Sequence, residues 1–138
     1  MISPINDPGP LKTQEDAVRY FISRLDADMV DTLLDEKRTY QDMDKQVFIA
    51  NLRHAFDEFL EAGDTVLLCT PGQCNSTECN YRYRGYSFEG NKSTKHMDLI
   101  IENDNEGRVR DIYECRHFLC DGNRKTNCMD TRVRIRRL

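Results

Sequence analysis

The sequence predicts an α+β domain in which helices come first and a curved antiparallel sheet follows. Residues 13–62 contain apolar side chains that repeat at helical spacing, whereas residues 65–120 contain four runs rich in β-branched and aromatic residues. Short clusters of turn-forming residues separate these runs, and connections of this length usually join antiparallel neighbours. A chain of 138 residues is long enough for one domain with a substantial core.

The first half of the chain predicts two short helices after an irregular start. Residues 1–12 contain three of the four prolines, so we expect an irregular lead-in there. Thr13 precedes acidic residues and can cap a first helix, whose apolar side chains repeat as far as Leu25. Residues 26–28 break this repeat and can cap a short second helix. Residues 37–41 lack apolar periodicity, which indicates a loop or a short strand.

A longer third helix is expected to follow Asp44, which is placed to act as its cap. Gly63 suits the end of this helix, because glycine readily takes the left-handed conformation that terminates helices. The apolar stripe of the helix is wide enough to lie across a sheet. This stripe consists of Val47, Phe48, Ile49, Leu52, Ala55, Phe56, Phe59 and Leu60.

Four strands of a meander make up the predicted sheet. They are expected over residues 65–70, 80–88, 95–102 and 108–115. The turns between them are expected at residues 71–72, 89–91 and 103–107. The last turn has a faint likeness to a calcium loop, but it lacks the later ligands of such a loop. A hairpin turn that ends in glycine is therefore predicted instead.

The C-terminal extension, residues 120–138, ends in the most basic cluster of the chain. Residues 131–138 alternate arginines with apolar residues, which predicts an edge strand with one solvated face. The arginines on that face are Arg132, Arg134 and Arg136, opposite Val133 and Ile135. A site for an anion or RNA is the alternative interpretation. The net charge of −4 argues against a protein dedicated to nucleic-acid binding.

The order of two helices, a short strand, a long helix and a meander resembles the NTF2-like superfamily, which includes ketosteroid isomerase-like and SnoaL-like proteins. The resemblance spans residues 13–119 and includes the sequence Gly85-Tyr-Ser-Phe-Glu-Gly-Asn91, which closes the second meander strand, and Asp98-Leu-Ile-Ile-Glu102 before the last hairpin. It implies a cone-shaped fold with a cavity between the long helix and the concave face of the sheet. The superfamily includes both enzymes and proteins without catalytic activity.

Members of the superfamily that resemble the isomerases use a carboxylate base and a tyrosine or a protonated acid that polarises a carbonyl group. The candidates here are Asp98 as base, Tyr20, Tyr40 or Tyr113 as polarising group, and His96 or His117 as alternative bases. In the alternative interpretation, the aspartate faces solvent and the tyrosines belong to the core. The side chains expected to line a ligand cavity are Tyr40, Phe56, Tyr86 and Phe88.

The six cysteines allow three interpretations. Free, partly buried thiols suit a cytoplasmic protein. A disulfide is the second interpretation, either Cys74–Cys79 or a pair among the last three cysteines. The third is a zinc site, although the spacing is not that of a close C-x2-C pair. The ligands of that site would be Cys115, His117, Cys120 and Cys128.

The leading hypothesis is a protein without catalytic activity that binds a small ligand or a protein partner and forms a homodimer through its sheet. The alternatives are a small isomerase or lyase, and a metal or redox site built on the cysteines. Tyrosines and arginines interleave over residues 81–86, which suits a dimer surface at least as well as single-stranded nucleic acid. No resident cofactor is expected. No apolar run spans a membrane and no secretory signal is visible, so we expect a cytoplasmic location unless a signal was removed.

Overall fold

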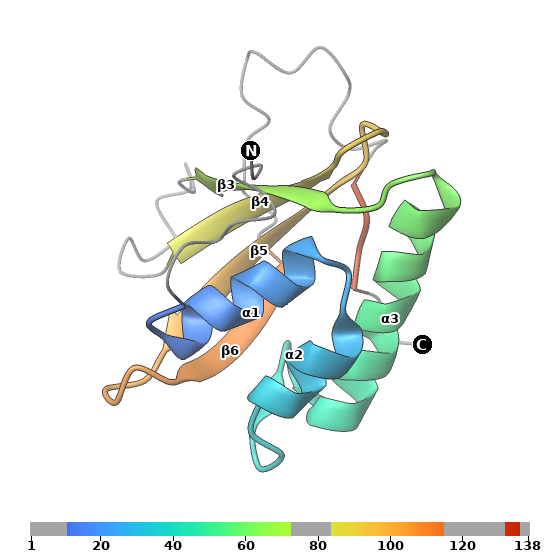
Figure 1. Ribbon diagram of the computed structural model, residues 1–138. Helices are drawn as coiled ribbons and strands as arrows, with labels where there is room; N and C mark the ends of the chain where they lie inside the picture. The colour runs from blue at the N-terminus through green and yellow to red at the C-terminus, as the bar shows by residue number, and fades with distance from the viewer. Residues whose placement is uncertain (1–10, 73–83, 115–131, 136–138) are drawn as a thin grey trace.

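Three helices cover one side of a four-stranded antiparallel sheet in the computed structural model, which describes residues 11–72, 84–114 and 132–135 (Figure 1). The helices are α1 (Gln14–Ser23), α2 (Ala27–Leu33) and α3 (Lys45–Glu61). The strands are β1 (Thr39–Tyr40), β2 (Met43–Asp44), β3 (Leu67–Gly72), β4 (Arg84–Gly90), β5 (His96–Asn103) and β6 (Val109–Glu114). The predicted α+β class is confirmed.

The ends of the helices agree with the local signals in the sequence. The Thr13 hydroxyl accepts a hydrogen bond from the Asp16 backbone N–H at 3.1 Å, and Asp26 caps α2 in the same way through Met29. Asp44 stands at the N-cap of α3 but makes no side-chain bond to its first turn. Gly63 follows α3 with φ of +93°, as a left-handed terminating residue should.

The apolar stripe of α3 is narrower than the sequence predicted. Most of its members are buried in the core, but Val47 and Leu60 are 43% and 51% exposed. These two side chains lie at the margins of the stripe, beyond the surface that the sheet and the other helices cover. The buried part of the stripe therefore excludes these two residues.

The sheet has the order β3-β4-β5-β6, as the predicted meander requires. The prediction of a turn at residues 71–72 is wrong, because β3 continues through Pro71, which pairs with Tyr86. An edge strand tolerates proline, since one side of its backbone needs no ladder hydrogen bond. The turn expected at residues 103–107 is confirmed: Asp104 accepts hydrogen bonds from the N–H groups of Glu106 and Arg108, and Gly107 has φ of +80°.

A bulge between β5 and β6 changes which side chains share a face. Glu102 pairs with Asp111, whereas Asn103 pairs with Val109, so β6 carries one extra residue at this point. Val109 and Ile112 are consequently both buried in the core. Asp111 alternates with Ile112 and lies on the other side of the sheet. Without the bulge, the regular alternation of a strand would place Val109 and Asp111 on the same face.

Residues 132–135 run parallel to the beginning of β5, where the Val133 backbone N–H donates to the His96 carbonyl oxygen at 2.7 Å (Figure 1, red segment). Val133 and Ile135 are 1% and 2% exposed, so the predicted apolar face is confirmed. The prediction that the arginines face solvent is wrong for Arg132. Its side chain is only 6% exposed, because it lies against the Asp98 carboxylate.

Candidate functional site

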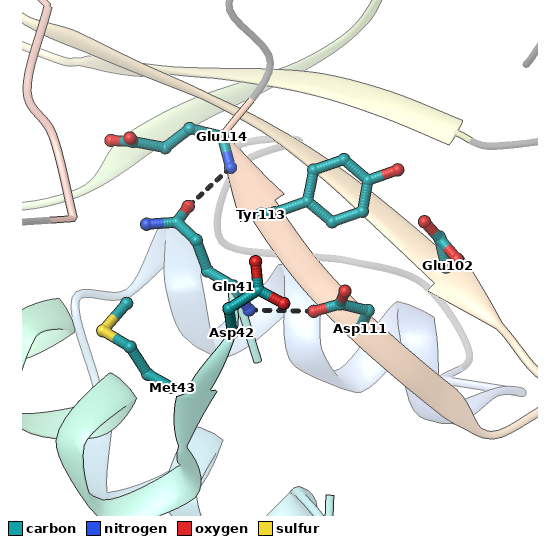
Figure 2. A pocket seen from close by; sticks show the side chains of 7 residues that line it. All are labelled: Gln41, Asp42, Met43, Glu102, Asp111, Tyr113 and Glu114. Carbon is teal, nitrogen blue, oxygen red and sulfur yellow. Dashed lines mark hydrogen bonds between the residues drawn. The ribbon is translucent and has the colours of Figure 1, made fainter. Parts of the chain in front are cut away.

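A pocket of about 620 Å³ lies at the β6 edge of the sheet, next to the β1–β2 hairpin (Figure 2). Its volume is within the range of small-molecule sites. We refer to it as the acidic pocket because four of the residues that line it are acidic. The lining residues are Gln41, Asp42, Met43, Glu102, Asp111, Tyr113 and Glu114.

The β1–β2 hairpin is fixed to β6 through Gln41. The Gln41 backbone N–H donates to Asp111 Oδ1 at 2.9 Å, and its side-chain Oε1 accepts from the Glu114 N–H at 2.8 Å (Figure 2). Gln41 and Asp42 have φ of 51° and 59°, the left-handed values that a two-residue type I′ hairpin turn requires. The turn thereby presents Asp42 on the same side of the pocket as Asp111.

Asp111 lies within a field of negative charge. Burial raises its pKa, and the nearby charges of Glu102 and Asp42 raise it further. Two backbone N–H groups, those of Gln41 and Ile112, oppose this effect by donating to its carboxylate. Glu102 stands directly opposite Asp111 in the sheet, and like charges at such positions repel each other. Arg110 offsets part of the Glu102 charge through an ion pair of 2.5 Å.

Four of the residues predicted to be catalytic are distributed over three places. Tyr113 lines the acidic pocket. His96 and Asp98 are 1% and 3% exposed and form a buried polar cluster with Arg132. There the His96 Nδ1 atom lies 3.1 Å and the Arg132 guanidinium 3.5 Å from Asp98 Oδ2. Tyr20 lies on α1 with its ring edge-on to Phe21.

Asp98 is stabilised as a carboxylate within the buried polar cluster. Burial acts to raise its pKa, but hydrogen bonds from His96 and Ser87 and the charge of Arg132 outweigh burial and lower the pKa below the ordinary value. A carboxylate held in this way is an electrostatic partner for Arg132. The cluster therefore joins residues 132–135 to the sheet, as a structural ion pair would.

The four aromatic residues expected to line a ligand cavity are all buried in the core. The Tyr40 hydroxyl accepts a hydrogen bond from the Asp35 N–H at 3.0 Å. The Arg19 guanidinium lies 4.6 Å from the centre of the Tyr86 ring, and Phe88 packs inside the hydrophobic cluster. Phe56 also borders a second pocket of about 430 Å³ beside α2 and α3. Their role in ligand binding stays a prediction.

Cys69 is the cysteine that lies within the described residues, where it forms no disulfide. Burial raises the pKa of this thiol to about 11, despite the opposing charge and hydrogen bond of Arg19, so it is a poor nucleophile at neutral pH. The other five cysteines and the predicted ligand His117 lie outside the described residues. Within residues 11–72, 84–114 and 132–135, no group of three or more His, Cys, Asp or Glu side chains could hold a metal ion.

The sequence analysis did not predict that the acidic residues of this pocket lie together. Glu102 and Asp111 flank the last hairpin, and pairing the two strands about that turn would have brought them together. Asp42 and Glu114 carried no such signal, because their approach depends on the docking of a two-residue hairpin about 70 residues away along the chain. Periodicity within one element does not predict contacts of that kind.

Comparisons with protein-family models, curated proteins and solved structures gave no match to this chain. In the part of the chain that the structure describes, the helices are too short or too polar to cross a membrane. The chemistry of the acidic pocket is therefore the main basis for inferring a function.

Proposed function

We propose that this protein binds, without catalytic turnover, a small organic cation in the acidic pocket. The observation that carries the proposal is the placement of Asp111, half-buried beside Glu102 and Asp42 in a pocket of about 620 Å³. Packing these carboxylates together costs free energy, and a bound cation would recover part of it. Clusters of ionisable groups with perturbed pKa values are typical of functional sites.

The shape and lining of the pocket favour a primary amine or a guanidinium compound over a bare metal ion. The pocket has room for several non-hydrogen atoms, and Tyr113 and Met43 add an aromatic ring and a thioether to its wall. Amines and guanidinium groups form charge-assisted hydrogen bonds with carboxylates, and an aromatic ring can also attract them. The ligand class proposed here is therefore an aliphatic amine or an arginine-like side chain.

Agmatine, which carries one amine and one guanidinium group, is a suitable probe for isothermal titration calorimetry. We expect Glu102→Gln combined with Asp111→Asn to weaken agmatine binding by about a hundredfold, because each lost charge-assisted contact is worth roughly tenfold. A matched control, Asp57→Asn with Glu61→Gln, removes two exposed charges from α3 and should bind agmatine as the wild type does. Equal affinities in all three proteins, or no binding to the wild type, would contradict the proposal.

An isomerase or lyase is the second candidate, and the same carboxyl group supports it. A carboxylate whose pKa is raised by burial, such as that of Asp111, can act as a general base. Tyr113 lines the same pocket and has a hydroxyl group that could polarise a carbonyl group of the substrate. Faster exchange of the α-protons of a cyclic enone in the presence of the wild type than of Asp111→Asn would favour this candidate.

We also propose membership of the NTF2-like superfamily, because the element order of three helices and a meander agrees with it. On the helix-facing side of the sheet, buried Leu67, Phe88, Leu99 and Ile112 pack against the helices. This packing supports binding at the edge of the sheet more than chemistry inside the cone. The homodimer, the cytoplasmic location and the cysteine-based metal or redox site stay predictions.

A further inference from the structure

Residues 132–135, which we call the docked segment, contact the acidic pocket through the backbone of Ile135. The Ile135 N–H donates to Glu114 Oε1 at 2.6 Å, and the Ile135 carbonyl oxygen accepts from Gln41 Nε2 at 2.8 Å. Gln41 and Glu114 both line the pocket. Because the Ile135 side chain is buried in the core, the position of its backbone is fixed.

Gln41 is the junction between the docked segment and the pocket. Its side-chain Nε2 donates to Ile135, its Oε1 accepts from the Glu114 N–H at 2.8 Å, and its backbone N–H donates to Asp111 at 2.9 Å (Figure 2). The turn that contains Gln41 also contains Asp42. The position of Asp42 relative to Asp111 therefore depends on the hydrogen bonds that hold Gln41.

The docked segment is held to the sheet by contacts that lie away from the pocket. The Val133 side chain is 1% exposed, and its backbone N–H donates to the His96 carbonyl oxygen at 2.7 Å. The Arg132 guanidinium lies 3.5 Å from the Asp98 carboxylate. None of these four residues lines the pocket. Because they fix the backbone that leads to Ile135, they act on the pocket through that residue.

We propose that the docked segment positions the acidic pocket: its release frees the turn of Gln41 and Asp42 and lowers the affinity of the pocket for a cation. Val133 and Ile135 are then positioning residues, which act on the site through Gln41. Coupling between two sites is reciprocal, so a cation bound in the pocket stabilises the docked segment in return. The effect on cation affinity rests on the proposed function, whereas the effect on the turn does not.

Native-state hydrogen exchange of the full chain, measured by NMR, tests the positioning without any added ligand. In Val133→Ala, we expect the amides of Gln41 and Glu114 to exchange up to about tenfold faster than in the wild type, because two buried methyl groups that hold the segment are lost. A matched control, Val18→Ala, makes the same change at a fully buried position of α1 and should leave these two rates near the wild-type values. Faster exchange in both variants, or in neither, would overturn the proposal.

Agmatine binding to the full chain then separates the inference from the proposed function. Val133→Ala should bind agmatine several-fold more weakly than the wild type and Val18→Ala, and equal affinities would overturn the coupling to the pocket. In the wild type, agmatine should slow the exchange of the Val133 amide, whereas an unchanged rate at saturating agmatine would count against the reciprocal effect. If Val133→Ala alone speeds the exchange of Gln41 but agmatine binds to none of the proteins, the positioning stands and the proposed function fails.

Discussion

Asp111 has a cost in stability that the proposed binding of a cation would offset. Its carboxylate lies opposite Glu102 of the neighbouring strand and on the same side of the pocket as Asp42, and burial together with these charges raises its pKa. A group whose pKa is raised on folding binds its proton more tightly in the folded than in the unfolded chain. Ionised Asp111 therefore destabilises the fold at neutral pH. Residues that favour function over stability are expected at binding sites.

We expect Asp111→Asn to stabilise the protein slightly while weakening the binding of agmatine. The asparagine oxygen can still accept from the Gln41 and Ile112 N–H groups, while the repulsion disappears. Because the site is half-exposed and solvent screens it, the gain at pH 7 should be a few tenths of a kcal/mol. The gain should vanish as the pH falls below about 4, where the aspartate is protonated in both states. Urea denaturation that shows a less stable variant at pH 7 would contradict this.

At the scale of elements, Asp64 connects the end of α3 to the turn between β4 and β5. Its Oδ1 atom accepts from the N–H groups of Lys92 and Ser93 at 2.8 and 2.7 Å, and its Oδ2 atom accepts from the Ser93 hydroxyl. The side chain is buried, so these bonds replace water. Gly90 makes this arrangement possible, because a Cβ atom there would lie 2.1 Å from the Asp64 carboxylate.

Gly90→Ala should therefore lower the free energy of unfolding by about 1–3 kcal/mol, the usual cost of overpacking. A double-mutant cycle identifies the cause: in an Asp64→Ala background, the added methyl group has room and should cost much less. Urea denaturation of the wild type, the two single variants and the double variant gives the coupling free energy between Gly90 and Asp64. Equal costs of Gly90→Ala in both backgrounds would show that the backbone of Gly90, and not the contact with Asp64, sets the effect.

Elements were predictable from the sequence wherever their signal is local. Thr13 and Gly63 mark helix ends through their own chemistry. The extension of β3 through Pro71 was not predictable, because it depends on β3 being an edge strand. The acidic pocket was missed for a similar reason: the bulge in β6 and the docked hairpin define it, and both are consequences of packing.

At the scale of the whole molecule, the end of the described chain completes the sheet. In the described residues, β6 pairs with β5 from Leu99 onward, and residues 132–135 lie beside the first residue of β5. This arrangement explains why Asp98 is buried, against the alternative interpretation that it faces solvent. Arg132, more than 30 residues later, provides the opposite charge that makes this burial tolerable.

Asp98→Asn should accordingly destabilise the protein by about 3 kcal/mol at pH 7, because the buried Arg132 guanidinium would lose the negative charge of Asp98 beside it. The pKa of Asp98 is lowered by folding, so its contribution is present above the unfolded value near 4 and is lost as the pH falls through the lower folded value. The difference between wild type and variant should therefore be constant from pH 5 to 7 and shrink below about pH 4. Asp57→Asn, the same change on the exposed surface of α3, should stay within about 0.5 kcal/mol of the wild type. If urea denaturation shows the same difference in free energy of unfolding between wild type and Asp98→Asn at pH 2 as at pH 7, the ion pair does not hold residues 132–135 to the sheet.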